Sequence, residues 1–302
     1  MPSRGHLRLH FVGIGPPRAN VPESGFGGEA QFLKSVGETG KTAWIVLDRL
    51  SLEQARQQAL AAVDGRGPAR GILSPNIRTL RQTADAVLGQ APRIARPLTG
   101  LQKRQLILRL LTNAERAGRL PHFGRAHRLT RVAEQVDRAF TEIAHHAPRD
   151  EQGRLKWASP TVEPADRELA FLLHVYQQAL EEHSLVDAEG RLAMATNLLR
   201  GNQPGPLAGF ETVLASGFRV LTRLERGLLA AIGQHAKRLV VTLPWPRGRA
   251  LPDVTQPPAD DAASPWHAVH RMAFELAEEF GQVQTTVEDQ PDAPPDANAQ
   301  AN

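Results

Sequence analysis

The sequence predicts an α/β protein in which a parallel β-sheet is split by an inserted set of helices. Strand-like and helix-like segments alternate before residue 100, which is the pattern of parallel β-α-β units. From residue 101 to residue 199 only helical patterns occur, and strand-like segments return over residues 211–243. One sheet built from two separated stretches of chain is therefore expected.

The first stretch contains three predicted strands. Residues 7–12 alternate in polarity and end at a glycine- and proline-rich turn, residues 42–47 form a buried strand, and residues 71–75 form a third, short strand. Helices are expected at residues 29–36, 52–63 and 78–88.

The helical insertion is predicted from an apolar stripe at residues 106, 107, 110 and 111, with further helices over residues 128–143 and 166–183. The chain then returns to a strand, a helix, a strand and a last helix, at residues 211–215, 221–234, 238–243 and 266–280.

These patterns predict four parts of the chain. Residues 1–100 begin the α/β domain, 101–200 form the helical insertion, 201–285 complete the α/β domain, and 286–302 form a disordered tail. The tail is rich in Pro, Asp, Ala, Asn and Gln, so it cannot bury enough apolar surface to offset the entropy of ordering.

Composition excludes several classes of protein. The chain of 302 residues contains no cysteine, which excludes a disulfide scaffold, a cysteine-ligated zinc and an iron–sulfur cluster. No apolar run reaches the roughly 18 residues of a membrane helix, and the first residues lack the apolar run of a secretory signal. A cytoplasmic protein without a membrane partner is expected.

The charge is mildly basic and carried mainly by arginine. Basic residues number 36 against 32 acidic residues, a net charge of +4, and 31 of the basic residues are arginines. Guanidinium groups bind phosphate in a forked geometry, so the composition permits nucleic-acid binding. A GC-rich genome would produce the same arginine bias.

The hexamer at residues 37–42 reads GETGKT and resembles part of a phosphate loop. Such a loop needs a glycine at position 35, where this chain has Ser35, and it must lead into a helix. Here a predicted strand follows instead, which favours an ordinary helix-to-strand turn. Under the alternative, a stand-alone nucleotide hydrolase binds ATP and Mg²⁺ through Gly37, Gly40, Lys41 and Thr42.

A second glycine turn follows the first predicted strand, where the architecture places a phosphate loop. It contains Gly13, Gly15 and Arg18 but no lysine. Pro16 and Pro17 remove backbone donors that a phosphate would need. We therefore expect a degenerate phosphate loop, no complete ATP-hydrolysing site and no bound cofactor.

Four segments in a fixed order carry a resemblance to a known family. They are AWIVL with the following SLEQAR at residues 43–56, RPLTGLQKRQLILRLL at 96–111, ADREL through SLVDAEGRL at 165–192, and ASGFRVLT with LVVTLP at 215–244. Together they are similar to the N-terminal helicase-like region of the AddB/RexB family, the B subunits of bacterial ATP-dependent helicase–nucleases.

The resemblance implies a RecA-like, P-loop NTPase-type sheet with a helical insertion. It also implies DNA repair by double-strand-break processing, with DNA and a partner motor subunit as partners. Family members with a working nucleotide site have GxxGxGKT after the first strand and commonly an aspartate where this chain has Ser216. The family's C-terminal nuclease domain is missing, so the resemblance suggests a truncated or inactive scaffold that is not catalytic on its own. The other possibility for a chain that resembles only the N-terminal region is that it is the product of a frameshifted gene and has no independent role.

Basic residues on two predicted helices are the candidates for contact with DNA. Low aromatic content, 5%, limits base stacking, so binding is expected mainly to phosphates and to be sensitive to salt. A solvated helix face is the alternative. The candidates are Lys103, Arg104, Arg125, Arg128 and Arg131.

No metal site is expected from the histidines. The pair His145 and His146, and the pair His267 and His270, each lack an obvious third ligand, whereas zinc needs three or four. Asp187 and Glu189 lie in a predicted turn between helices, where a capping role is expected.

Overall fold

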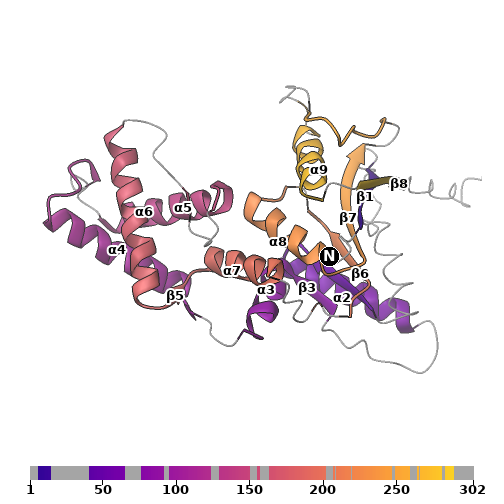
Figure 1. Ribbon diagram of the computed structural model, residues 1–302, viewed down its shortest axis with the longest axis horizontal. Coiled ribbons are helices and arrows are strands. Elements are labelled where there is room, and N and C mark those ends of the chain that lie inside the picture. The colour runs from indigo at the N-terminus through magenta and orange to yellow at the C-terminus, as the bar shows by residue number, and fades with distance from the viewer. Residues whose placement is uncertain are drawn as a thin grey trace, which may run out of the picture. The chain divides into compact units, whose positions relative to one another are not determined.

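The computed structural model shows a chain of helices and strands whose order is drawn in Figure 1. It describes residues 6–14, 41–64, 76–91, 95–123, 129–149, 155–156, 163–201, 207, 209–218, 220–246, 249–258, 264, 266–280 and 283–288.

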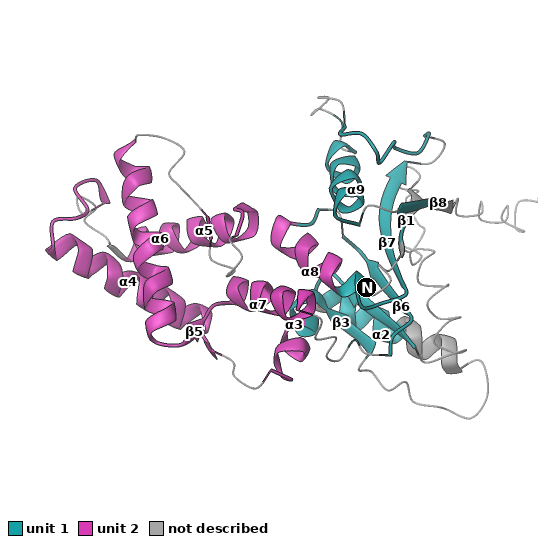
Figure 2. Ribbon diagram, in the orientation of Figure 1, with its two compact units in different colours: residues 1–83, 207–221, 232–302 teal, residues 84–206, 222–231 magenta. Residues whose placement is uncertain are grey.

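The chain forms two compact units, each assembled from separated stretches (Figure 2). Unit 1 comprises residues 1–83, 207–221 and 232–302, and unit 2 comprises residues 84–206 and 222–231. The helical stretch expected at residues 101–200 lies within the range of unit 2, which also includes residues 84–100 and 222–231.

Unit 1 contains a six-stranded sheet in the order β3-β2-β6-β7-β1-β8, in which all five neighbouring pairs are parallel. The predicted α/β class with a parallel sheet is confirmed. Strands from after the insertion lie between strands from before it. The strands are β1 (His6–Ile14), β2 (Thr42–Val46), β3 (Ile77–Thr79), β6 (Thr212–Ser216), β7 (Arg238–Pro246) and β8 (Val283–Glu288).

The central strands are apolar on both faces, as parallel strands covered on both sides must be. All five residues of β2 are buried, and residues 239–245 of β7 are buried as well. Trp44 and Ile77 contribute to one core cluster with Leu52 of α2 (Arg49–Asp64). Toward the β8 edge of the sheet, α9 (His267–Phe280) packs on β1 and β7.

Several predicted elements of this unit differ from the structure. The expected helix at 29–36 and strand at 71–75 lie outside the described residues. The helix expected from residue 78 begins at Leu80, because residues 77–79 pair with β2 as a strand. The expected tail from residue 286 overlaps β8, whose backbone pairs with β1 as far as Glu288. Residues 289–302 are outside the described parts.

Unit 2 is mainly helical. Its short strands β4 (Arg96–Pro97) and β5 (Leu185–Val186) pair in parallel. The unit boundary falls within α3 and within α8, so each of these helices belongs to both units. The helices are α3 (Leu80–Leu88), α4 (Gly100–Arg116), α5 (Leu129–His146), α6 (Pro164–Glu182), α7 (Ala188–Arg200) and α8 (Arg223–Gly233).

The core of unit 2 forms where α4, α5 and α6 meet. Ile107, Val136 and Tyr176 are buried members of one cluster, contributed by the three helices in turn. The start of α4 is fixed by a capping box, in which Thr99 and Gln102 satisfy each other's backbone N–H groups. No helix in the described parts of the chain has the length and apolar character to cross a bilayer.

Candidate functional site

The carboxyl ends of β2 and β6 form the point in unit 1 where an open parallel sheet usually binds a ligand. The two strands are neighbours, and the strand that follows each one lies on opposite sides of the pair: β3 beside β2, and β7 beside β6. Connections that diverge in this way leave a crevice outside the strand ends. Residues 47–48 and 216–218 occupy this edge.

Ser216, the last residue of β6, is turned into the fold. Its side chain is buried, and its hydroxyl accepts a hydrogen bond of 2.6 Å from the indole Nε1 of Trp44 on β2. Gly217 follows with a φ of +82°, a left-handed conformation that suits glycine and ends the strand sharply. The hydroxyl thus ties two strands together at the position where the AddB/RexB resemblance places an aspartate.

Asp48 is the carboxylate at the end of β2. It accepts a hydrogen bond of 2.8 Å from the backbone N–H of Ser51, which caps the first turn of α2. That backbone hydrogen bond, with one from the Ser51 side chain, lowers the pKa of Asp48 below its usual range. The carboxylate is therefore ionised at neutral pH and used to begin a helix.

Lys41 and Thr42 lie at the opposite, amino edge of the same sheet. Thr42 begins β2 and is buried, so these residues lead into a strand as the sequence predicts. The Lys41 ammonium lies 3.2 Å from Glu211 Oε1, and Lys237 binds the same oxygen at 3.0 Å. Hydrogen bonds from Lys237 and Lys41 lower the pKa of Glu211. No helix N-terminus follows Lys41, so the dipole of a phosphate loop is missing there.

The remaining nucleotide-site candidates are only partly described. Gly13 is the penultimate residue of β1, which pairs with β7 on one side and β8 on the other. Gly15, Arg18, Gly37 and Gly40 lie outside the described residues.

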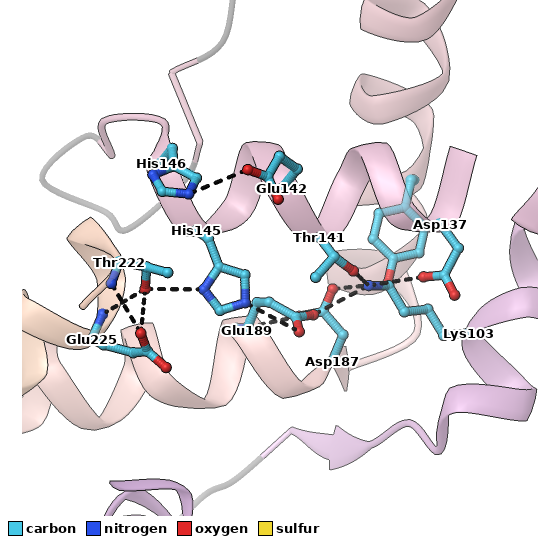
Figure 3. Close-up of polar contacts among 12 residues, drawn as sticks. Lys103, Asp137, Thr141, Glu142, His145, His146, Asp187, Glu189, Thr222 and Glu225 are labelled. Atoms are coloured by element: carbon cyan, nitrogen blue, oxygen red, sulfur yellow. Dashed lines mark hydrogen bonds and ion pairs between the residues drawn. The ribbon is translucent and has the colours of Figure 1, made fainter. Parts of the chain in front are cut away.

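Lys103, expected on a DNA-binding surface, lies instead in the interior of unit 2 (Figure 3). Its ammonium is 3.0 Å from Thr141 Oγ1, 3.1 Å from Asp137 Oδ1 and 3.2 Å from Glu189 Oε2. An ammonium has three N–H donors, so these partners use its whole capacity. Burial lowers the pKa of Lys103, but the charges of three nearby carboxylates outweigh burial and raise it overall.

The same network continues along α5 and into α8 (Figure 3). Nε2 of His145 is 4.0 Å from Glu189 Oε1, and its Nδ1 is 3.1 Å from Thr222 Oγ1. The Thr222 backbone N–H and hydroxyl both donate to Glu225 Oε2, and Thr222 Oγ1 accepts from the Glu225 backbone N–H, so the two residues form a capping box at the start of α8. These contacts join α4, α5 and α7 to the start of α8, where the first backbone N–H groups of a helix need partners from outside the helix.

Asp187 caps α7 as predicted, accepting from the Gly190 N–H at 2.7 Å. Its second oxygen accepts from the Tyr176 hydroxyl at 2.9 Å. Burial, followed by the Asp187 charge, raises the pKa of Tyr176 far above its usual range. Glu189, also expected to cap, is a buried partner of Lys103 instead; it is the second residue of α7, and Asp187 occupies the capping position.

The other DNA candidates differ in position. The side chain of Arg104 is 51% exposed and its Nε donates to the Gly100 carbonyl, and Arg131 is exposed on α5. Arg125 and Arg128 lie outside the described residues. The spacing of residues in the sequence distinguishes Lys103 from Arg104. Lys103, Ile107 and Leu111 are four positions apart and therefore share the buried face of α4, whereas Arg104 does not.

The histidine pairs are used in local contacts. His146 binds Glu142 on the preceding turn, and Nε2 of His270 is 3.0 Å from the Asp253 carbonyl. Among the described residues, no three His, Asp or Glu side chains are grouped so as to hold a metal ion.

No protein-family model matches the chain, and no curated protein matches its sequence. The resemblance to the AddB/RexB family therefore rests on the four sequence segments, which include parts of β2, α4, α6 and β6 in turn.

Proposed function

We propose that the protein is a DNA-repair module of the AddB/RexB type that contacts DNA and a partner motor subunit without hydrolysing ATP itself. Its parallel sheet is compatible with a RecA-like fold, and the mainly helical unit 2 is compatible with an insertion of the kind that the resemblance implies. On this view the sheet is a scaffold for the segments that bind DNA and the partner.

The observation that carries the proposal is the bond between Trp44 and Ser216 at the carboxyl edge of the sheet. An ATP-hydrolysing site needs a carboxylate that helps to hold the magnesium of the bound triphosphate. At the corresponding strand end this chain has a buried hydroxyl that already accepts from an indole. Because this strand end is used for internal packing and not for binding magnesium, we expect ATP to be hydrolysed by the partner motor subunit and not by this chain.

The lysine-bearing glycine turn supports the same conclusion. Lys41 is engaged by Glu211 at the amino edge of the sheet, away from the strand ends where open sheets bind ligands. The competing hydrolase hypothesis would need residues 37–42 to form the start of a helix.

Binding to DNA tests the proposal. Fluorescence anisotropy with labelled duplex, forked and single-stranded DNA over rising salt should show affinity that falls steeply as salt rises, because phosphate contacts release counterions. A pull-down with a motor subunit of the same family tests the second partner. Failure to bind any DNA at low salt, together with failure to capture the motor subunit, would contradict the proposal.

A further inference from the structure

Unit 2 contains a groove of about 910 Å³ that is lined by α4 and α6, by Arg96 of β4 and by residues 183–185, which lead into β5. Each helix contributes residues at positions i, i+3, i+4 and i+7, which form one face of a helix. The volume lies in the range of roughly 300–1,000 Å³ that small-molecule sites occupy. The groove is thus a formed concavity within a single unit.

Two arginines of the groove have no partner among the described residues. The side chains of Arg96 and Arg109 line it, and neither makes a hydrogen bond or ion pair with another residue in the described parts of the chain. The position of Arg96 is fixed, because its backbone N–H donates to the Ser184 carbonyl at 2.8 Å. By contrast, Arg191 in the same unit is paired with Asp85. Two unpaired guanidinium groups in one groove attract an anion.

The rest of the lining suits a nucleotide chain better than a lone anion. Asn113 and Gln178 add amide groups, and Leu106, Leu110 and Leu185 add an apolar surface. The one acidic side chain of the lining, Glu182, accepts a hydrogen bond of 2.8 Å from Gln178. Phosphates can meet the arginines while the amides hydrogen-bond to the sugars or to base edges. The lining that the structure describes contains no Phe, Tyr or Trp, so the binding expected here is to the backbone and not by base stacking.

We infer that this groove binds the phosphodiester backbone of a short segment of single-stranded DNA through Arg96 and Arg109. The inference rests on the proposed function and deepens it by naming where DNA is held. It differs from the sequence-based prediction, which placed the contact at Lys103 and its neighbours, because Lys103 is on the buried face of α4 whereas Arg109 is on the face that lines the groove.

The test compares two double variants in anisotropy with a labelled oligothymidylate. Arg96→Gln/Arg109→Gln should weaken binding roughly 10-fold or more, since about 1.4 kcal/mol corresponds to tenfold. It should also flatten the dependence of log affinity on log salt by about 1.4, which is two contacts at about 0.7 each for a single strand. The control Arg116→Gln/Arg138→Gln removes the same charge from exposed positions outside the groove and should leave affinity within about twofold at physiological salt.

A second measurement locates the DNA. The chain has no cysteine, so Asn113→Cys introduces a single thiol in the groove, and Gln135→Cys introduces one on the exposed face of α5. Single-stranded DNA should slow modification of the first thiol by a maleimide and leave the second unchanged. Circular dichroism confirms that each variant is folded.

The outcomes separate the two proposals. Wild-type binding that both double variants retain, with no protection at position 113, would overturn the groove assignment and leave the proposed function in place. Absence of any DNA binding by the wild type at low salt would overturn both. Tighter, equally arginine-dependent binding to blunt duplex would overturn the assignment to a single strand.

Discussion

The ammonium of Lys103 and the carboxylate of Glu189 lie 3.2 Å apart, and both side chains are less than 10% exposed. The pair links α4 to α7, and the two residues are 86 positions apart in the sequence. Bringing two charges out of water costs several kcal/mol for each ion, and the cost is offset only when both are well paired. Here the remaining donors of Lys103 reach Asp137 and Thr141, so the lysine is fully satisfied.

Removing the lysine should therefore unfold unit 2 more readily. Lys103→Met leaves Glu189 buried without its partner, and breaking a buried pair in this way costs about 3–5 kcal/mol. Urea denaturation followed by circular dichroism measures the loss. Arg104→Gln on the same helix, an exposed position, is the control and should change stability by less than about 0.5 kcal/mol.

An unfolding midpoint for Lys103→Met equal to that of the wild type would show that the lysine is not part of the interior. Equal losses for Lys103→Met and Arg104→Gln would have the same meaning.

Alkaline pH should weaken the fold through Tyr176 and Lys103. The folded state raises the pKa of both groups above their ordinary values of 10.0 and 10.5. Each group keeps its proton in the folded state at a pH where the unfolded state loses it. The stabilisation is therefore complete below about pH 10 and is lost as pH rises through the folded values.

Tyr176 makes this directly measurable, because it is the single tyrosine of the chain. Tyrosinate absorbance in the native protein should stay low where the urea-unfolded protein has already ionised, and should rise only with loss of helical circular dichroism. A native titration curve that superimposes on the unfolded one would contradict the buried Tyr176–Asp187 hydrogen bond.

Lys41 should have no role in nucleotide binding. Lys41→Ala removes an exposed ion pair with Glu211, so it should leave the fold intact. Calorimetric titration with ATP and Mg²⁺ should give the same trace for the variant and the wild type. Heat of binding that is present in the wild type and lost in Lys41→Ala would instead support the stand-alone hydrolase.

Ser216 should tolerate loss of its hydroxyl better than gain of a carboxylate. Ser216→Ala removes one buried hydrogen bond to Trp44 and should cost about 1 kcal/mol. Ser216→Asp places a charge in a site that is 3% exposed and should cost more, without creating ATP hydrolysis. An aspartate variant as stable as the wild type that also releases phosphate from ATP would contradict our account of this strand end.

The sheet could be predicted in outline because its central strands are short, continuous apolar runs. β2 and β7 were visible for that reason, and the residues of α4, α5 and α6 follow helical periodicity. β8 was not predicted, because Val283–Glu288 is a polar edge strand that depends on pairing with β1. Pairing between distant segments leaves no local signal in such a strand.

The sites were harder to predict than the fold. The Asp187 cap follows from local sequence, but the Lys103 network and the groove at Arg96 and Arg109 depend on how helices from distant segments pack. Charged residues on one helix look alike in sequence. Only the position of the buried face, given by Ile107 and Leu111, separates the buried Lys103 from the exposed Arg104.

The central claim is that the protein contacts DNA without an ATPase site of its own. Its most direct test is the salt dependence of wild-type binding to labelled forked DNA, measured by anisotropy with and without ATP and Mg²⁺. Our account predicts binding at low salt that weakens linearly on a log–log plot and is unchanged by the nucleotide. No binding at the lowest salt, or affinity that changes with ATP, would contradict it.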